Sequence, residues 1–309
     1  MAKDVLGMVD VQEVLPILLE QAARLKEWNQ QGQLYQPLAG RTLGMIFEKA
    51  STRTRVSFEV GMAQLGGRSI VLGTKDIQMG RGETTADTAR VLSRYLDGLM
   101  YRAFRYQDVA TLAANATIPV INGLDDREHP CQALADLQTI REHKGTDLSK
   151  VTLAYVGDGN NVCNSLLLAS AMVGMSMRVG CPEGARYQPN AEILATARRI
   201  ASGTGAHLEV LHDPKAAVSE ADVLYTDTWV SMGDEAEAVA RKAAFAGFCL
   251  DEVLLANARH DAIVLHCLPA HRGEEITDAV MDGPQSVVWD QAENRLHAQK
   301  ALLVYLLGG

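Results

Sequence analysis

Short runs of consecutive apolar residues alternate along the chain with longer stretches in which apolar residues recur every three or four positions. The short runs are typical of strands buried on both faces of a parallel sheet, and the longer stretches are typical of amphipathic helices. In the first half of the chain, the predicted helices cover residues 9–30, 54–65 and 85–96. The predicted strands of this half are residues 42–47, 69–72, 98–102 and 119–122.

The same alternation resumes in the second half of the chain. A predicted helix over 132–143 leads into the polar, turn-rich segment 144–150, where we expect the chain to enter a second domain. The predicted strands of that domain are residues 151–156, 177–180, 208–211, 223–225, 263–265 and 287–289. A final helix is predicted over 291–307. The pattern therefore predicts an α/β fold with two doubly wound parallel-sheet domains and an active-site cleft between them.

Length and charge narrow the function classes. The 309 residues are 47% hydrophobic and 22% charged, which suits two globular domains of ordinary size. The net charge is -9 and we find no basic stripe, so we expect no nucleic-acid partner. No apolar run reaches the roughly 18 residues of a membrane helix. Residues 1–4 show no signal core, so we expect no membrane partner and a cytoplasmic location.

The five cysteines are scattered, odd in number and never spaced as a C-x-x-C pair. This pattern argues against a disulfide framework and against a structural zinc site. We expect most of them to be small buried hydrophobic residues, and we predict no metal.

The segment Ser51-Thr52-Arg53-Thr54-Arg55 follows a predicted strand and precedes a predicted helix. A helix start offers free backbone N–H groups and the positive end of a dipole, and arginine can bind a phosphate through two parallel hydrogen bonds. The simpler interpretation is a helix N-cap with surface arginines. Three hydroxyls and two arginines within five residues favour an anion site.

The segment His129-Pro130-Cys131-Gln132 follows the predicted strand that ends near Asn122. Histidine can donate to a carbonyl oxygen as negative charge builds on it, and glutamine offers both a donor and an acceptor. Taken alone, the segment fits equally well a turn followed by a helix with Pro130 at its first position.

The loop Gly157-Asp158-Gly159-Asn160-Asn161 follows the first predicted strand of the second domain. The dinucleotide-binding fingerprint G-x-G-x-x-G needs a small residue where Val162 stands, which disfavours a nicotinamide cofactor. The glycines fit a tight turn, and the asparagines suit a polar, uncharged contact with a ligand.

Two further polar segments follow strands of the second domain. Asp227, shortly before 231–233, could hold a cationic amine, although a solvated carboxylate at a strand exit would explain it as well. The loop 266–273 offers one cysteine and two histidines with no second cluster at zinc-site spacing. Within that loop, Leu268-Pro269 is a candidate for a cis peptide bond.

Taken together and in this order, these segments resemble the carbamoyltransferase family over nearly the whole chain. Ser-Thr-Arg-Thr-Arg at 51–55 and His-Pro-x-Gln at 129–132 are similar to the family's carbamoyl-phosphate signatures. Segments 227–233 and 266–269 resemble the ornithine-binding loop and second signature of members that use ornithine. The resemblance implies an enzyme that carbamoylates L-ornithine from carbamoyl phosphate without a cofactor. The products would be L-citrulline and phosphate, in arginine biosynthesis or a urea-cycle-type step.

The resemblance also implies roles for single residues. Those at carbamoyl phosphate would be Ser51, Thr52, Arg53, Thr54, Arg102, His129, Gln132, Cys267, Leu268 and Arg295. Those at ornithine would be Asn161, Asp227, Ser231 and Met232. The catalytic groups would be Arg102, His129, Cys267 and Arg295.

The family's architecture implies a carbamoyl-phosphate-binding domain over 1–137, completed by a C-terminal helix at 291–309 that packs back on it. An ornithine-binding domain would cover 138–290. The resemblance further implies a homotrimer or an assembly of trimers. The polar loop 78–83 would either reach a neighbouring subunit's site or form solvated surface.

Two alternatives stay open beside ornithine. A related carbamoyltransferase would use aspartate, putrescine or an acylated ornithine. An acidic substrate would favour an arginine in segment 227–233, where Asp227, Ser231 and Met232 stand. A non-catalytic binding protein on the same fold would be expected to lack a phosphate-motif arginine or His129, and both are present.

Overall fold

The chain folds into two compact units of parallel sheet and helix. Our computed structural model describes residues 4–73, 76–79, 82–230 and 235–308. The first unit comprises Met1–Gln138 with Glu293–Gly309, and the second comprises Thr139–Ala292. Two long helices, α5 (Pro130–Lys144) and α12 (Val288–Leu307), contribute residues to both units.

The first unit is built on a four-stranded parallel sheet in the order β2-β1-β3-β4. Its strands are β1 (Thr42–Phe47), β2 (Arg68–Gly73), β3 (Gly98–Arg102) and β4 (Val120–Leu124). Its other helices are η1 (Met8–Val11), α1 (Leu15–Gln30), α2 (Thr52–Gln64), α3 (Thr85–Leu92) and α4 (Tyr106–Asn115). The sheet order reverses between β1 and β3, and ligands bind beyond the carboxyl ends of strands at such a point.

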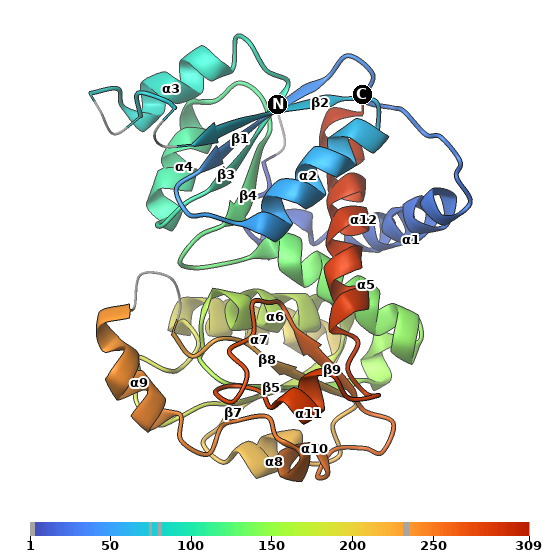
Figure 1. Cartoon of the computed structure of the whole chain (residues 1–309), viewed down its shortest axis with the longest axis vertical. Coiled ribbons are helices and arrows are strands. Elements are labelled where there is room, and N and C mark those ends of the chain that lie inside the picture. Colours follow the sequence, from blue (N-terminus) through green and yellow to red (C-terminus); the bar gives the residue numbers. More distant parts are fainter. Residues whose placement is uncertain (1–3, 74–75, 80–81, 231–234, 309) are drawn as a thin grey trace. The chain divides into compact units, whose positions relative to one another are not determined.

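The second unit is built on a five-stranded parallel sheet in the order β7-β6-β5-β8-β9. Its strands are β5 (Thr152–Val156), β6 (Ser176–Gly180), β7 (Leu208–Leu211), β8 (Val223–Thr226) and β9 (Ile263–His266). Its helices are η2 (Leu148–Lys150), α6 (Asn161–Val173), α7 (Ala191–Thr204), α8 (Pro214–Val218), η3 (Glu235–Glu237), α9 (Ala238–Ala244), α10 (Glu252–Leu255) and α11 (Asp278–Met281). Figure 1 shows α6 and α7 on one face of this sheet and α8, α10 and α11 on the other. The order reverses between β5 and β8, which marks their carboxyl ends as the place for a ligand.

The C-terminal helix α12 packs on the first unit, as expected. Gln299 Nε2 donates to Ser57 Oγ on α2 at 2.7 Å, and Lys300 Nζ donates to Gln64 Oε1 at 2.8 Å. From α1, Lys26 Nζ donates to Asn294 Oδ1 at 2.9 Å. Figure 1 shows the red helix α12 beside α2 and α1. The expected α/β class with two doubly wound parallel sheets is confirmed.

One predicted strand is wrong. Residues 287–289 were expected to form a strand because two valines and a tryptophan follow one another. The chain makes only a single bridge there, between Ser286 and Val264 of β9, and α12 begins at Val288. Val288 is buried but Trp289 is 60% exposed, so the apolar run belongs to the first turn of a helix and only one of these side chains enters the core.

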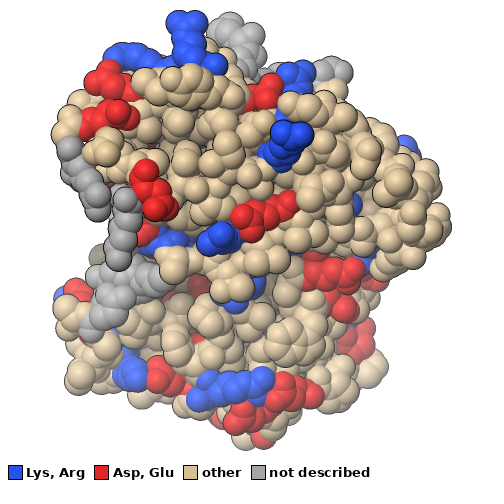
Figure 2. Space-filling view, turned by 45° about the horizontal axis from the view of Figure 1, so that its top comes forward, with Lys and Arg blue, Asp and Glu red and all other residues tan. Residues whose placement is uncertain are grey.

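Charged side chains of both signs are intermixed over the face shown in Figure 2. The net charge of -9 is therefore not gathered into one acidic patch on the described part of that face. None of the helices in the described ranges combines the length and the apolar character that crossing a membrane requires.

Candidate active site

The segment 51–55 forms the N-cap and first turn of α2, shortly after β1. Ser51 is the N-cap: its Oγ accepts a hydrogen bond from the Thr54 backbone N–H at 3.2 Å. Thr52 is exposed, Arg53 is half-buried and Thr54 is 1% exposed. The capping and anion-site interpretations are compatible, because a capped helix start still presents its positive dipole end and further N–H groups.

Thr54 joins two arginines that are far apart in the sequence. Its Oγ1 accepts from Arg102 Nη1 at 3.4 Å and from Arg295 Nη2 at 3.3 Å. Arg102 ends β3, which pairs with β1 in a register that sets Arg102 beside Phe47, just before the motif loop. Arg295 lies on α12. Both guanidinium groups are almost fully buried, so their charges are poorly screened by water.

Gln132 completes this cluster from α5, which begins at Pro130 as expected. Its Oε1 accepts from Arg295 Nη1 at 2.7 Å, and its Nε2 donates to Asp136 Oδ1 at 2.8 Å. The amide is therefore oriented from both ends, and it is 1% exposed.

His129 lies at the same place, immediately before α5, and is 4% exposed. Its pKa is held well below the ordinary histidine value, chiefly by burial and then by the positive charges of Arg295, Arg102 and Arg53. The imidazole is consequently neutral at physiological pH. A neutral ring among three arginines can donate to an oxygen without adding to their mutual repulsion.

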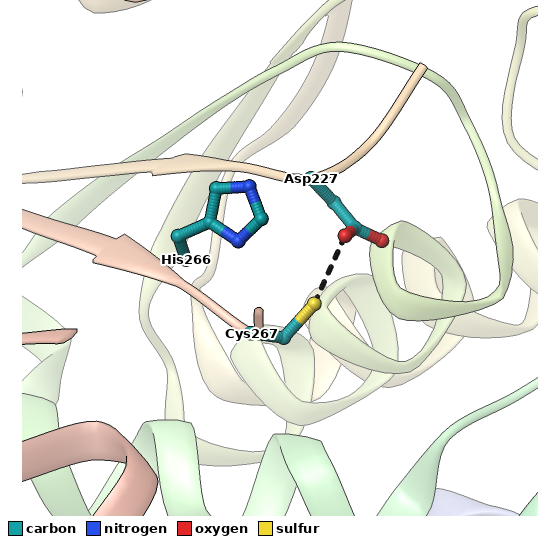
Figure 3. Close-up of side chains that lie close together, drawn as sticks. All are labelled: Asp227, His266 and Cys267. Atoms are coloured by element: carbon teal, nitrogen blue, oxygen red, sulfur yellow. Dashed lines mark hydrogen bonds between the residues drawn. The ribbon is translucent and has the colours of Figure 1, made fainter. Parts of the chain in front are cut away.

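In the second unit, Asp227 and Cys267 follow neighbouring strands. The register of β8 and β9 pairs Thr226 with His266, which sets the next two residues side by side. The Cys267 thiol donates to Asp227 Oδ1 at 3.0 Å, and Figure 3 shows the sulfur pointing at that carboxylate. Asp227 is 5% exposed. A buried, oriented carboxylate suits an amine or ammonium ligand.

Asn160 also holds Asp227, a contact that the sequence did not indicate. Its Nδ2 donates to Asp227 Oδ2 at 2.8 Å, while its Oδ1 caps α6 by accepting from the backbone of Val162 and Cys163. Asn161, the predicted ligand residue, is the half-buried first residue of α6. The predicted Ser231 and Met232 lie outside the described residues.

The loop after β5 needs glycine for backbone packing. A Cβ on Gly159 would lie 2.2 Å from the carbonyl carbon of Gln188, and no such contact is tolerated. Asp158, in the same loop, pairs with Arg241 of α9, and Arg241 Nε donates to the carbonyl of Trp229 at 2.8 Å. Arg241 thus ties the loop that carries Asn160 to the segment that follows Asp227. Sequence spacing gives no signal for this pair.

Among the described residues, Asp227, His266 and Cys267 form a group that could hold a metal ion, because their ligand atoms lie within 4.8 Å of one another. His266 Nδ1 accepts from the Leu268 backbone N–H at 2.9 Å, which leaves Nε2 as the N–H that donates to Glu275 at 3.1 Å. Both ring nitrogens are engaged, so the ring cannot ligate without losing a buried hydrogen bond. The donor set therefore favours an amine-binding pair over a metal site.

The loop after β9 is shaped by the expected cis peptide bond between Leu268 and Pro269. Leu268, the remaining predicted site residue, is half-buried with a φ of 62°. Three of the five cysteines, Cys131, Cys163 and Cys181, are buried as expected.

Comparison with known proteins identifies the family. The carbamoyl-phosphate-binding domain of aspartate/ornithine carbamoyltransferases matches residues 3–142, and their Asp/Orn-binding domain matches 149–306. An ornithine carbamoyltransferase of Methanoculleus marisnigri is 56% identical over 310 residues, covering 100% of this chain and 98% of the relative. An anabolic ornithine carbamoyltransferase of Pyrococcus furiosus is 53% identical, covering 99% and 97%.

Solved structures agree with these matches. The ornithine carbamoyltransferase structure from Pyrococcus furiosus superposes with a TM-score of 0.96 at 53% identity, over 100% of this chain and 98% of that one. The likeness covers both units. The chain belongs to the aspartate/ornithine carbamoyltransferase family.

Proposed function

We propose that this chain transfers the carbamoyl group of carbamoyl phosphate to the side-chain amine of L-ornithine, giving L-citrulline and phosphate. The observation that carries the proposal is the convergence of Arg102 and Arg295 on Thr54, in the first turn of α2. Two buried cations beside a helix start support this proposal, because they would stabilise the negative charge of a phosphate and of an adjoining carbonyl oxygen. The names of the relatives support the same activity.

Carbamoyl phosphate would be held by the first unit. The motif residues would bind the phosphate, and Arg102 would reach both the phosphate and the carbonyl. His129 and Gln132 would hold the carbamoyl group. The residues in these roles are Ser51, Thr52, Arg53, Thr54, Arg102, His129, Gln132 and Arg295.

Ornithine would be held by the second unit. Asp227 and Asn161 would bind its amino-acid end together with Ser231 and Met232, while Cys267 and Leu268 would meet the reactive amine. The buried Asp227 carboxylate favours ornithine over aspartate as the amine substrate, because an acidic ligand would be repelled there.

The reaction is an acyl transfer that needs a neutral amine. Loss of water around the ammonium group favours the form with a free lone pair, and the ammonium proton leaves to solvent as the substrate binds. The Cys267 sulfur then offers an uncharged acceptor for an N–H of the neutral amine. The amine attacks the carbamoyl carbon, and negative charge develops on the carbonyl oxygen. Thr54, Arg102, His129 and Arg295 stabilise that oxyanion. The carbon–oxygen bond to phosphate then breaks, and the leaving phosphate accepts the surplus proton.

A substrate panel tests this proposal. Carbamoyl phosphate is supplied with ornithine, aspartate, putrescine or N-acetylornithine, and the carbamoylated product is measured for each. Product from ornithine alone supports both halves of the site. Product from another amine keeps the carbamoyl-phosphate half and overturns the ornithine half. No product with any amine favours a non-catalytic binding protein on the same fold.

Three finer expectations go with this proposal. We infer a role in arginine biosynthesis, in line with the relative that is named anabolic. We also infer a cytoplasmic location and a homotrimer or an assembly of trimers. Sedimentation analysis of the purified chain would distinguish a trimer from a larger assembly.

A further inference from the structure

We propose that Gln299 is a positioning residue for this reaction. Its neutral amide fixes the Arg295 guanidinium while leaving the positive charge available to the carbonyl oxygen of carbamoyl phosphate. The inference rests on the proposed function and adds to it a residue that lies outside the sequence motifs.

Gln299 lies one helical turn after Arg295 on α12, at the spacing that brings side chains together on a helix. Its Oε1 accepts from Arg295 Nε at 3.0 Å and from Nη2 at 2.8 Å. Gln299 is fully buried and Arg295 is 2% exposed. Two hydrogen bonds to one oxygen set the plane of the guanidinium, so Gln299 restricts where Arg295 can point.

The amide also connects Arg295 to the phosphate motif. Gln299 Nε2 donates to Ser57 Oγ at 2.7 Å, and Ser57 Oγ donates to the Arg53 carbonyl at 2.5 Å. A guanidinium has donors only, so the amide oxygen must face Arg295 and the amide nitrogen must face Ser57. Gln299 therefore fixes Arg295 relative to the first turn of α2, where the phosphate would bind.

The neutrality of the amide is the second part of the argument. The other acceptors described above for Arg295, Gln132 Oε1 and Thr54 Oγ1, are also uncharged. Uncharged acceptors orient a guanidinium without cancelling its field. A carboxylate at the same distance would form a buried ion pair and weaken the field at the developing oxyanion.

The decisive comparison uses Gln299→Glu and Gln299→Met in the full chain. The glutamate keeps an acceptor for Arg295 but cancels its charge, whereas the methionine removes the acceptor and keeps the charge. We expect kcat to fall about 100-fold with Gln299→Glu and about 10-fold with Gln299→Met. The KM for ornithine should change less than about 3-fold in both, because the oxyanion forms only in the transition state.

A purely structural role predicts the reverse order. An introduced carboxylate would retain the link to Arg295, so Gln299→Glu would be at least as active as Gln299→Met. That result in folded variants would overturn the proposal. Gln64→Glu is the matched control: Gln64 Oε1 accepts from the buried Lys300, the neighbour of Gln299 in sequence. This variant places the same charge beside a cation on the same helix, and its kcat should stay within about 3-fold of the parent.

A titration of His129 by NMR separates this proposal from the proposed function. Part of the lowering of the His129 pKa comes from the charge of Arg295. Gln299→Glu should raise that pKa relative to the parent, and Gln299→Met should not. If the parent forms no citrulline, the proposed function fails. The titration then remains as the test of whether Gln299 preserves the charge of Arg295. An identical His129 pKa in all three proteins would then overturn the role of Gln299.

Discussion

The Cys267 thiol donates a hydrogen bond to the Asp227 carboxylate, with 3.0 Å between Sγ and Oδ1. The other oxygen of that carboxylate accepts from Asn160 Nδ2 at 2.8 Å. The carboxylate is thus oriented at both oxygens, and each oxygen keeps a lone pair for a further donor. An amine with several N–H groups is the ligand that this arrangement fits.

Replacing Asp227 should damage ornithine use selectively. Asp227→Asn removes the charge that attracts the amine, and hydrogen bonds to charged groups contribute about 1.5–3 kcal/mol. We therefore expect kcat/KM for ornithine to fall about 10- to 100-fold, with the KM for carbamoyl phosphate within about 3-fold of the parent.

Asp213→Asn is the control for this change, because Asp213 caps α8 and asparagine caps helices equally well. It should leave both kinetic constants unchanged. An equal loss for the two substrates in Asp227→Asn would contradict the assignment of Asp227 to ornithine.

Removing the motif arginine should abolish most catalysis. Arg53→Ala takes away a cation at the phosphate, and we expect kcat/KM to fall by roughly three powers of ten, the order seen when a group that stabilises developing charge is lost. Steady-state kinetics with varied carbamoyl phosphate measure this loss. Arg24→Ala, which removes an exposed partner of Glu20 on α1, serves as the control. Near-normal activity of Arg53→Ala would exclude this phosphate site.

The buried pair of Arg241 and Asp158 should be important for stability. Arg241→Met leaves Asp158 as an uncompensated buried charge, so the free energy of unfolding should fall by about 3–5 kcal/mol. Arg272→Met removes an arginine that pairs with Asp278 and Asp282 at the surface, where water screens the charges, and it should lower the free energy of unfolding far less. Urea unfolding measures both. Equal costs would show that burial of the Arg241 pair has no energetic consequence.

The buried His297 of α12 should make the chain sensitive to acid. Burial lowers its pKa from 6.5 to about 4, against an opposing hydrogen bond with Glu293. Between those values the unfolded chain takes up a proton that the folded chain does not, so stability falls as the pH falls. From about pH 7.5 to about pH 5, His297 should account for a loss of about 2 kcal/mol.

His297→Gln should reduce that loss, whereas His260→Gln should not, because His260 is exposed. The free energy of unfolding of each variant is measured by urea denaturation at the two pH values. An unchanged pH dependence in His297→Gln would contradict the burial of an uncharged ring at this position.

The fold was largely predictable because central parallel strands read as uninterrupted apolar runs. Residues 42–47 and 98–102 coincide with β1 and β3 for this reason. The strand prediction for residues 287–289 was wrong because β-branched residues also occur in the first turn of a helix. Here α12 begins at Val288, and only Ser286 forms a bridge, to Val264. Single-sequence periodicity does not separate these two cases.

Candidate site residues could be recognised from the sequence only where they cluster along the chain. The segment 51–55 can be recognised from its hydroxyl and arginine residues. Gln299 and Arg241, in contrast, form hydrogen bonds with residues that are far away in the sequence and become neighbours only on folding. Gln299 had one available signal, its spacing of four residues from Arg295 on a predicted helix. Asp158 and Arg241 are 83 residues apart, and no spacing rule links them.

The central claim is direct transfer between two substrates, and the measurement that tests it is the simultaneous release of phosphate and citrulline from carbamoyl phosphate and ornithine. The account predicts equal amounts of the two products, with phosphate release strongly dependent on ornithine. Phosphate released without citrulline would show a hydrolase, and citrulline formation at a near-normal rate in Arg53→Ala would place the reaction outside the site described above. Either result would contradict the account.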